Sequence, residues 1–204
     1  RAQEPLELMH GDLCGLVTPA TPGRRRFFLL LVDETTCFMW VSLLTTKLAT
    51  TVAIKRTRVE AEKACGRKLR VLRTDNGREF TATEFADYCA DDGITHHYST
   101  PYSPQQNGIV ERRNQTVMGM VWALLKQRGM PMKFWGEVVV TAVHLLNRSP
   151  TKSLQGTTPY EAWYGHAPAV AHLRVFGCLY FVKELNQVRK LDDHSRPGVF
   201  LGYA

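Results

Sequence analysis

The spacing of two acidic residues constrains this chain more than any other feature of its sequence. Asp75 follows a short apolar run at residues 69–72 that is typical of a buried strand. Glu111 opens a long helical pattern, and 35 residues lie between the two acids. Asp12 ends another strand-like run at residues 5–10. Carboxylates at two strand ends and one helix start can converge on Mg²⁺, a hard ion that prefers carboxylate oxygen. Two such ions suit in-line attack on a phosphodiester, because they stabilise both the attacking and the leaving oxygen.

Each acid taken alone also has an ordinary structural explanation. The Asp75-Asn76-Gly77 run favours a turn, since Asn and Gly tolerate left-handed backbone. Glu111 is also a first-turn acid of the kind that the helix dipole favours. Asp33 is a rival metal ligand, but the turn chemistry of residues 33–36 explains it. The adjacent His96 and His97 have no second His or Cys pair at ligand spacing, so a zinc site is not indicated. The combination of three acids carries the prediction.

The formal net charge of +7 favours an anionic partner, and nucleic acid is the first candidate. A merely solvated basic surface remains an alternative. Arg24, Arg25 and Arg26 sit in a Pro/Gly-containing loop at residues 18–26, where they either contact a phosphate backbone or form a solvated hairpin tip. The five cysteines are scattered with no Cys-x-x-Cys pair, which indicates neither a disulfide framework nor zinc and fits a reducing compartment. No membrane span or secretory signal is expected, and the abrupt ends indicate a piece of a longer polyprotein.

The order of the elements along the chain predicts a mixed α/β fold. Strands are expected at residues 6–13, 27–32, 37–44, 69–72 and 94–98, and helices at 47–64, 84–92, 134–147 and, more briefly, 158–163. The 47–64 helix carries a mixed stripe that includes Val52 and Val59. The helix with Glu111 begins either at Pro104 or after Gly108 and runs to about Arg128. Strand-like runs at 173–182 and 198–203 indicate a small β extension.

Three motifs at this spacing resemble a known family. The runs HGDLCG (10–15), RTDNGREF (73–80) and YSPQQNGIVERRN (102–114) resemble the D,D-35-E catalytic core of retroviral and retrotransposon integrases, and most of all the copia-type (Pseudoviridae) LTR retrotransposon integrase. Later runs, TPYEAWYG (158–165), LRVFGCLYFV (173–182) and KLDDHSRPGVFLGY (190–203), also resemble copia-type polyproteins. The resemblance covers essentially the whole chain.

The resemblance implies a ribonuclease-H-like fold, a five-stranded mixed sheet flanked by helices, with a catalytic core at 1–165 and a truncated β extension at 166–204. It implies a DNA integrase, a polynucleotidyl transferase with endonuclease-type chemistry that performs 3′-end processing and strand transfer of element cDNA into host DNA. Asp12, Asp75 and Glu111 would be the catalytic, metal-binding acids, holding two Mg²⁺ (or Mn²⁺) ions, with no zinc in this fragment. The implied partners are double-stranded DNA (element ends and target) and further copies of the chain. The implied site of action is nuclear, within a polyprotein or virus-like particle, with no membrane involved.

The residues that would contact DNA are less well defined by the resemblance. Relatives carry basic residues four and seven positions after the glutamate, where this chain has Gln115 and Met118. The candidates for DNA binding are Asn76, Tyr102, Gln105, Gln106, Asn107, Arg112, Arg113 and Lys126. Two other function classes remain open: a nuclease of the same fold, for which a fourth active-site acid would be expected, and a catalytically silent, transposon-derived domain that binds DNA or protein.

Overall fold

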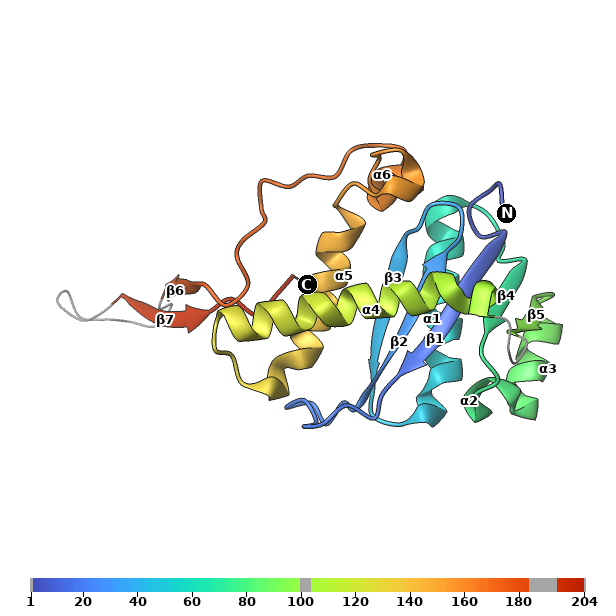
Figure 1. Ribbon diagram of the computed structural model, residues 1–204, viewed down its shortest axis with the longest axis horizontal. Helices are drawn as coiled ribbons and strands as arrows, with labels where there is room; N and C mark the ends of the chain where they lie inside the picture. Colours follow the sequence, from blue (N-terminus) through green and yellow to red (C-terminus); the bar gives the residue numbers. More distant parts are fainter. Residues whose placement is uncertain (1, 100–103, 184–193, 204) are drawn as a thin grey trace.

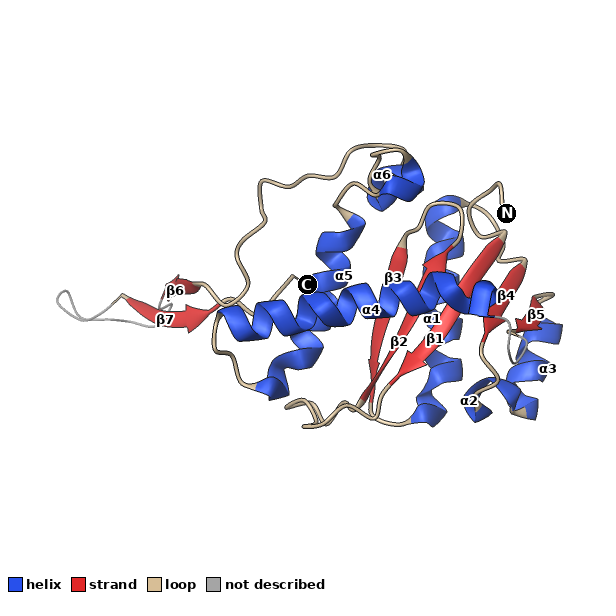
Figure 2. Cartoon of the chain, in the orientation of Figure 1, coloured by secondary structure: helices blue, strands red, loops and turns tan. Residues whose placement is uncertain are grey.

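A computed structural model describes residues 2–99, 104–183 and 194–203, and for residues 104–107 the backbone alone. The chain forms a three-layer body in which a central sheet lies between two groups of helices (Figures 1 and 2). A two-stranded ribbon close to the C-terminus projects away from this body (Figure 1). The mixed α/β fold and the small β extension predicted from the sequence are both confirmed.

The central sheet has the strand order β3-β2-β1-β4-β5. Its strands are β1 (Leu8–Cys14), β2 (Phe27–Asp33), β3 (Met39–Leu44), β4 (Val71–Thr74) and β5 (Thr95–Tyr98). Strands β1, β2 and β3 pair antiparallel, whereas β4 runs parallel to β1 and β5 runs parallel to β4. Because β1 and β4 are parallel neighbours, their C-terminal ends meet at the same end of the sheet.

Alternate residues of β2 supply two separate cores, which explains its continuous apolar run. Phe28, Leu30 and Val32 pack with α4 and α5 on one face of the sheet. Leu29 and Leu31 pack on the opposite face with residues of α1, α2 and α3. A strand covered on both faces favours apolar residues throughout, and β2 is buried from its second residue onward, with Asp33 at its end the one polar residue.

The helices are η1 (Lys47–Ala49), α1 (Thr50–Cys65), α2 (Arg78–Thr81), α3 (Thr83–Asp91), α4 (Pro104–Gln127), η2 (Met132–Phe134), α5 (Trp135–Asn147), η3 (Lys152–Leu154) and α6 (Pro159–Tyr164). Helix α4 takes the earlier of its two predicted starts. Its buried stripe is Val110, Val117, Val121 and Leu125 at helical spacing. None of the helices in the described ranges is both long and apolar enough to cross a bilayer.

Several predicted boundaries and one buried face differ in the structure. Strand β4 begins two residues later than the apolar run at 69–72, because the ladder with β1 starts at Val71. Helix α1 buries Thr50, Ile54 and Ala61 and leaves the predicted valine stripe in solvent, with Val52 66% and Val59 55% exposed. The face that packs on the sheet therefore consists largely of small and polar residues, which an apolar-stripe reading does not detect.

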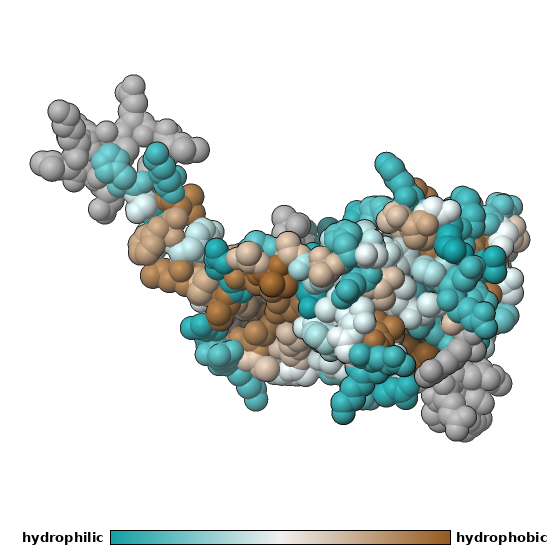
Figure 3. Space-filling view, turned by 90° about the horizontal axis from the view of Figure 1, so that it is seen from above, coloured by the Kyte–Doolittle hydropathy of each residue, from teal (hydrophilic) through white to brown (hydrophobic). Residues whose placement is uncertain are grey.

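The C-terminal ribbon consists of β6 (Leu179–Lys183) and β7 (Ser195–Val199), paired antiparallel. Both strands differ in position from the predicted runs at 173–182 and 198–203. All five residues of β6 are exposed, including Leu179 (63%) and Phe181 (65%). Figure 3 shows this apolar surface as the brown band where the ribbon leaves the body.

Candidate active site

Asp12 and Asp75 lie side by side because of the register between β1 and β4. Leu8 pairs with Val71 and His10 pairs with Arg73 in this parallel ladder. The same offset continued by two residues brings Asp75, the first residue after β4, level with Asp12. Neighbouring strands are about 4.8 Å apart, and paired residues of parallel strands face the same side of the sheet. Two carboxylates therefore stand together on the face that α4 covers.

Helix α4 adds a third carboxylate and an amide to this place. Glu111 and Asn114 are three residues apart, so they share one face of the helix. The Asn114 side chain is 8% exposed, and its Nδ2 donates a hydrogen bond to Asp12 Oδ2. Asn114 Oδ1 is buried with no hydrogen-bond partner among the described residues. This contact fixes the helix face that carries Glu111 against the β1 carboxylate.

Asp12 is the carboxyl on which burial and the other two acids act together. Burial raises the pKa of the Asp12 carboxyl, and repulsion from Asp75 and Glu111 raises it further. The hydrogen bond from Asn114 opposes both effects by stabilising the ionised form. A carboxyl that is desolvated and flanked by two other carboxylates favours a nearby cation, because a cation removes the repulsion.

The carboxylates do not close around one point in the structure. Within residues 2–99, 104–183 and 194–203, no three His, Cys, Asp or Glu side chains form a group close enough to hold a metal ion. Asp12 Oδ2 is engaged by Asn114, and Glu111 is solvent-exposed. The three predicted acids are thus brought into electrostatic contact by the fold, while a closed ligand cage is absent from the described part of the chain.

The turn after β4 holds Asp75 in place. Gly77 N donates a hydrogen bond of 3.0 Å to Asp75 Oδ1. A Cβ on Gly77 would stand 2.9 Å from the Glu79 carboxyl carbon and 3.0 Å from Asp75 Oδ1, so a larger residue would displace these acids. Thr74, fully buried, places its Oγ1 2.9 Å from His96 Nε2. His96 thereby supports the end of β4, which agrees with a structural role.

Asp33, the rival ligand, has a structural role that agrees with its turn chemistry. It is fully buried, and its carboxylate accepts hydrogen bonds of 2.8 Å from Leu6 N, Thr36 N and Thr36 Oγ1. These donors join the N-terminal segment to the β2–β3 turn and leave the carboxylate no free direction toward a metal.

The predicted DNA-contacting residues are spread over several places. Asn76 is exposed in the turn after Asp75. Tyr102 and the side chains of Gln105, Gln106 and Asn107 lie outside the described residues. Lys126 stands 15 residues after Glu111 on α4, about 22 Å along the helix at 1.5 Å per residue, with its Nζ 5.8 Å from the Trp122 ring centroid.

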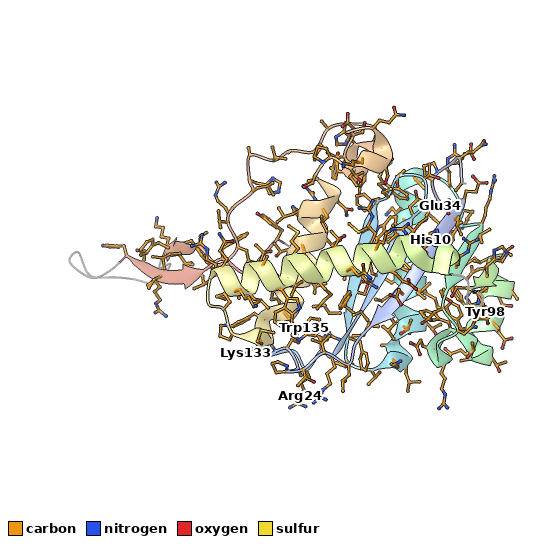
Figure 4. The ribbon with its side chains drawn as sticks, viewed as in Figure 1. His10, Arg24, Glu34, Tyr98, Lys133 and Trp135 are labelled. Carbon is orange, nitrogen blue, oxygen red and sulfur yellow. The ribbon has the colours of Figure 1, made fainter. Side chains whose placement is uncertain are left out.

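Arg112 and Arg113 face a cavity to which none of the three predicted catalytic acids contributes a wall. Its volume is about 390 Å³, and its walls also include Ala2, Glu34, Thr35 and Ser153. Beside it, His10 is fully buried and its Nε2 lies 3.0 Å from Glu34 Oε2 (Figure 4). The sequence assigned no role to this pair or to Asn114, although His10 begins the first motif and Asn114 ends the third.

Comparison with known proteins identifies the class to which this fold and site belong. The model of the family described as "Integrase core domain" matches residues 2–104. The chain therefore belongs to the integrase core domain family, as its motifs predicted.

Similar proteins include Pol polyproteins of transposons and of foamy viruses. The chain is 38% identical over 97% of its length to the retrovirus-related Pol polyprotein from transposon TNT 1-94 of Nicotiana tabacum, and 32% identical over 98% to that from transposon RE1 of Arabidopsis thaliana. It is 35% identical over 67% of its length to the Pro-Pol polyprotein of simian foamy virus type 1. The chain spans only 15%, 14% and 11% of these three relatives.

Solved structures of low sequence identity share the fold. The HTLV-2 integrase catalytic core domain in complex with magnesium aligns with a TM-score of 0.59 at 21% identity, covering 80% of this chain and 99% of that one. The simian T-cell lymphotropic virus intasome, solved with a PP2A regulatory subunit, aligns with a TM-score of 0.64 at 18% identity, covering 98% of this chain and 69% of that one. The ribonuclease-H-like fold implied by the motifs is thereby confirmed.

Proposed function

We propose that this chain is the catalytic core of a retrotransposon integrase, a polynucleotidyl transferase that processes the 3′ ends of element DNA and joins them to host DNA. The observation that carries the proposal is the placement of Asp12 and Asp75 at two neighbouring parallel strand ends, with Asn114 joining Asp12 to the helix face that carries Glu111. Membership of the integrase core family supports the reaction class. The sequence similarity to transposon Pol polyproteins supports a retrotransposon as the source.

The residues present fit a pair of divalent cations. The donors are carboxylate oxygens, which hard cations prefer, and Asn114 Oδ1 is a buried oxygen without a partner in the described chain. Asp75 and Glu111 repel the ionised Asp12 carboxylate, and a bound cation would offset this repulsion. Asp12 and Asp75 would hold one ion, and Asp12 and Glu111 the other. A relative of the same fold was solved in complex with magnesium, which supports the choice of metal.

When bound, the ions would supply an activated oxygen nucleophile and charge stabilisation at the phosphate. The chain itself would orient the reactants. Asn114 holds the Asp12 carboxylate in one orientation, and the Gly77 amide does the same for Asp75. In 3′-end processing, water oxygen forms the new P–O bond and the 3′ oxygen of the shortened strand leaves with a proton. In strand transfer, the oxygen of that 3′ hydroxyl forms the new P–O bond at a target phosphodiester, and the 3′ oxygen of the cut target strand leaves with a proton. No side chain acts as nucleophile in either step.

The reaction also implies partners that this chain alone does not supply. Pairing two element ends with a target calls for several copies of the protein on double-stranded DNA, and the solved intasome of similar fold supports such an assembly. The implied site of action is the nucleus, where host DNA lies. Because the chain spans about 15% of the Nicotiana tabacum relative, these properties are proposed for the longer protein that contains it.

The test is Mg²⁺- or Mn²⁺-dependent phosphodiester transfer on a branched DNA that mimics an integration product, a reaction that asks least of additional domains. We expect the wild-type chain to resolve the branch, and Asp12→Asn, Asp75→Asn and Glu111→Gln each to lose activity. Glu79→Gln is the matched control, because Glu79 stands in the same region but pairs with Lys47 Nζ at 3.3 Å. Cleavage without strand joining would favour the nuclease alternative. A folded wild-type chain with no metal-dependent reaction would favour the silent DNA- or protein-binding alternative and would refute the proposal.

A further inference from the structure

The loop between β1 and β2 presents three consecutive arginines that have no acidic partner. We refer to residues 18–26 as the arginine loop. Arg24, Arg25 and Arg26 are all exposed, and Figure 4 shows Arg24 at the margin of the molecule. Among the described residues, none of the three guanidinium groups forms an ion pair or a side-chain hydrogen bond. Three consecutive exposed arginines without an acidic partner concentrate positive charge on one short loop.

The arginine loop has a defined backbone structure. Thr21, which is 7% exposed, donates its backbone N–H to Arg25 O at 3.0 Å, and its Oγ1 accepts from Arg25 N at 3.0 Å. Arg24 N donates to Thr21 O at 2.8 Å. At the base of the loop, Arg26 N donates to Leu44 O at 2.9 Å, and its own carbonyl accepts from Val17 N at 2.8 Å. A backbone held this way loses little conformational entropy when its side chains bind a ligand.

The start of α5 anchors the loop to the core and adds a fourth cation. Trp135, 2% exposed, donates from Nε1 to Pro19 O at 2.9 Å. A Cβ on the next residue, Gly136, would stand 2.8 Å from Thr21 Cγ2, so the loop packs directly on the helix. Lys133 is exposed two residues before Trp135, and Figure 4 shows it along the same margin as Arg24. Lys133 has no ion pair to any other residue that the structure describes.

The strand register fixes how far this surface lies from the carboxylates. Asp12 pairs with Leu30 and Cys14 pairs with Phe28, so Arg26 stands at a level four residues beyond Asp12. At about 3.3 Å per strand residue, this is roughly 13 Å. One strand of B-DNA carries a phosphate about every 3.4 Å along its axis, so roughly four phosphates span the interval. Figure 1 shows the loop along the lower edge, where η1 and α2 also lie.

We propose that the arginine loop and Lys133 bind the phosphate backbone of double-stranded DNA beside the three carboxylates. The inference rests on the proposed function for its choice of ligand. The carboxylates repel phosphate in the absence of metal, so a duplex needs attraction from adjacent cations to lie across them. Phosphate contacts from arginine and lysine fix position without reading sequence. The loop is therefore a positioning surface, separate from the groups that act at the reacting phosphate.

The test measures duplex DNA binding in EDTA across a range of NaCl concentrations, using fluorescence anisotropy. We expect Arg24→Gln/Arg25→Gln/Arg26→Gln to reduce the slope of log Kobs against log[NaCl] by roughly 2 to 3, at about 0.9 for each phosphate that the protein no longer neutralises. Lys133→Gln, on a different element, should reduce the slope by about 1. The matched control is Lys63→Gln/Arg70→Gln/Lys152→Gln, which removes three exposed charges that have no ion pair in the described structure. They belong to the end of α1, the residue before β4 and η3, and none is in the arginine loop.

The outcomes separate this inference from the proposed function. A wild-type slope in the arginine variant, an equal reduction in the control, or no duplex binding by the wild-type chain at low salt would each overturn the inference. Because binding is measured without metal, these results do not depend on catalysis. If branched-DNA transfer fails while the arginine variant alone has a reduced slope, the DNA-binding surface stands and the proposed reaction falls. Circular dichroism of each variant confirms that the comparison is between folded proteins.

Discussion

The hydrogen bond between Asn114 and Asp12 should give a measurable coupling free energy between these two side chains. Asp12 is a buried carboxylate with two acidic neighbours, and Asn114 Nδ2 is a hydrogen-bond donor to it. A hydrogen bond to a charged group contributes about 1.5–3 kcal/mol to stability. We therefore expect a coupling free energy of about that size between the two side chains in a double-mutant cycle of Asp12→Ala and Asn114→Ala.

Each single substitution should change the free energy of unfolding by less than the coupling free energy. Asn114→Ala removes the donor, but it also removes a buried Oδ1 that has no partner in the described residues, and alanine has about 0.5 kcal/mol better helix propensity. The net loss is then about 1 kcal/mol, which for a chain of 204 residues lowers Tm by roughly 2–4 °C. Asp12→Ala relieves repulsion with Asp75 and Glu111, so it should destabilise the fold little or even stabilise it.

The assay is urea unfolding of the four proteins at pH 7 without metal. Gln115→Ala, at an exposed amide on the same turn of α4, is the matched control, and we expect its coupling to Asp12→Ala to be below about 0.5 kcal/mol. A coupling for Asn114 as small as that of Gln115 would refute the claim that Asn114 positions Asp12.

Two further predictions concern the packing of α5. Asn147 accepts from Met39 N at 2.9 Å and donates to Met39 O at 2.8 Å, so Asn147→Ala should lower the unfolding free energy by about 2–5 kcal/mol, because two buried backbone groups of edge strand β3 lose their partners. Burial, with repulsion from Arg148 and His172, lowers the pKa of His144 to about 4, and its ring stacks on Tyr203 at 4.2 Å. Below the ordinary pKa of 6.5 the unfolded chain protonates this histidine, whereas the folded chain does so only at about pH 4. The free energy of unfolding therefore decreases as the pH falls from 6.5 to about 4, by about 1–2 kcal/mol after allowance for solvent screening. His144→Phe keeps the stack and should remove this part of the loss in urea titrations at about pH 7 and about pH 4.5.

Each of these two predictions has a clear contrary result. A loss below about 1 kcal/mol for Asn147→Ala would mean that water or another group satisfies Met39 once the amide is gone. An unchanged pH dependence in the phenylalanine variant would mean that His144 titrates normally in the folded chain.

The sequence predicted most of the secondary structure because the determining signals are local. The apolar run at 27–32 predicted a strand buried on both faces, and β2 supplies alternate residues to two cores. Thr158 followed by Pro159 predicted a helix start, and Thr158 Oγ1 accepts from Glu161 N at 3.0 Å. Helical spacing predicts a buried face at Val110, Val117, Val121 and Leu124; the three valines are buried, whereas Leu124 is half-buried and Leu125 takes its place.

The features that the sequence did not predict depend on contacts between distant segments. The four residues of α2 carry too weak a pattern to distinguish a short helix from a turn. Helix α1 buries a face that consists mainly of threonines and Ile54, so the valine stripe predicted the wrong face as the buried one. Asn114 is one of several polar residues on α4, and its contact with Asp12 follows from a strand 102 residues earlier in the chain. The acids were found because their spacing is a family signature, whereas their supporting residues have no such pattern.

The proposed reaction requires that Asp12, Asp75 and Glu111 form a divalent metal site. Anomalous diffraction from crystals of this chain soaked with Mn²⁺ would locate the ions. We expect anomalous density between Asp12 and Asp75, at carboxylate–metal distances of about 2.0–2.2 Å, with a second peak near Glu111 when DNA is present. In crystals of Asp75→Asn the first peak should be lost. Well-ordered wild-type crystals with no manganese at these carboxylates, with and without DNA, would mean that the three acids do not form a metal site.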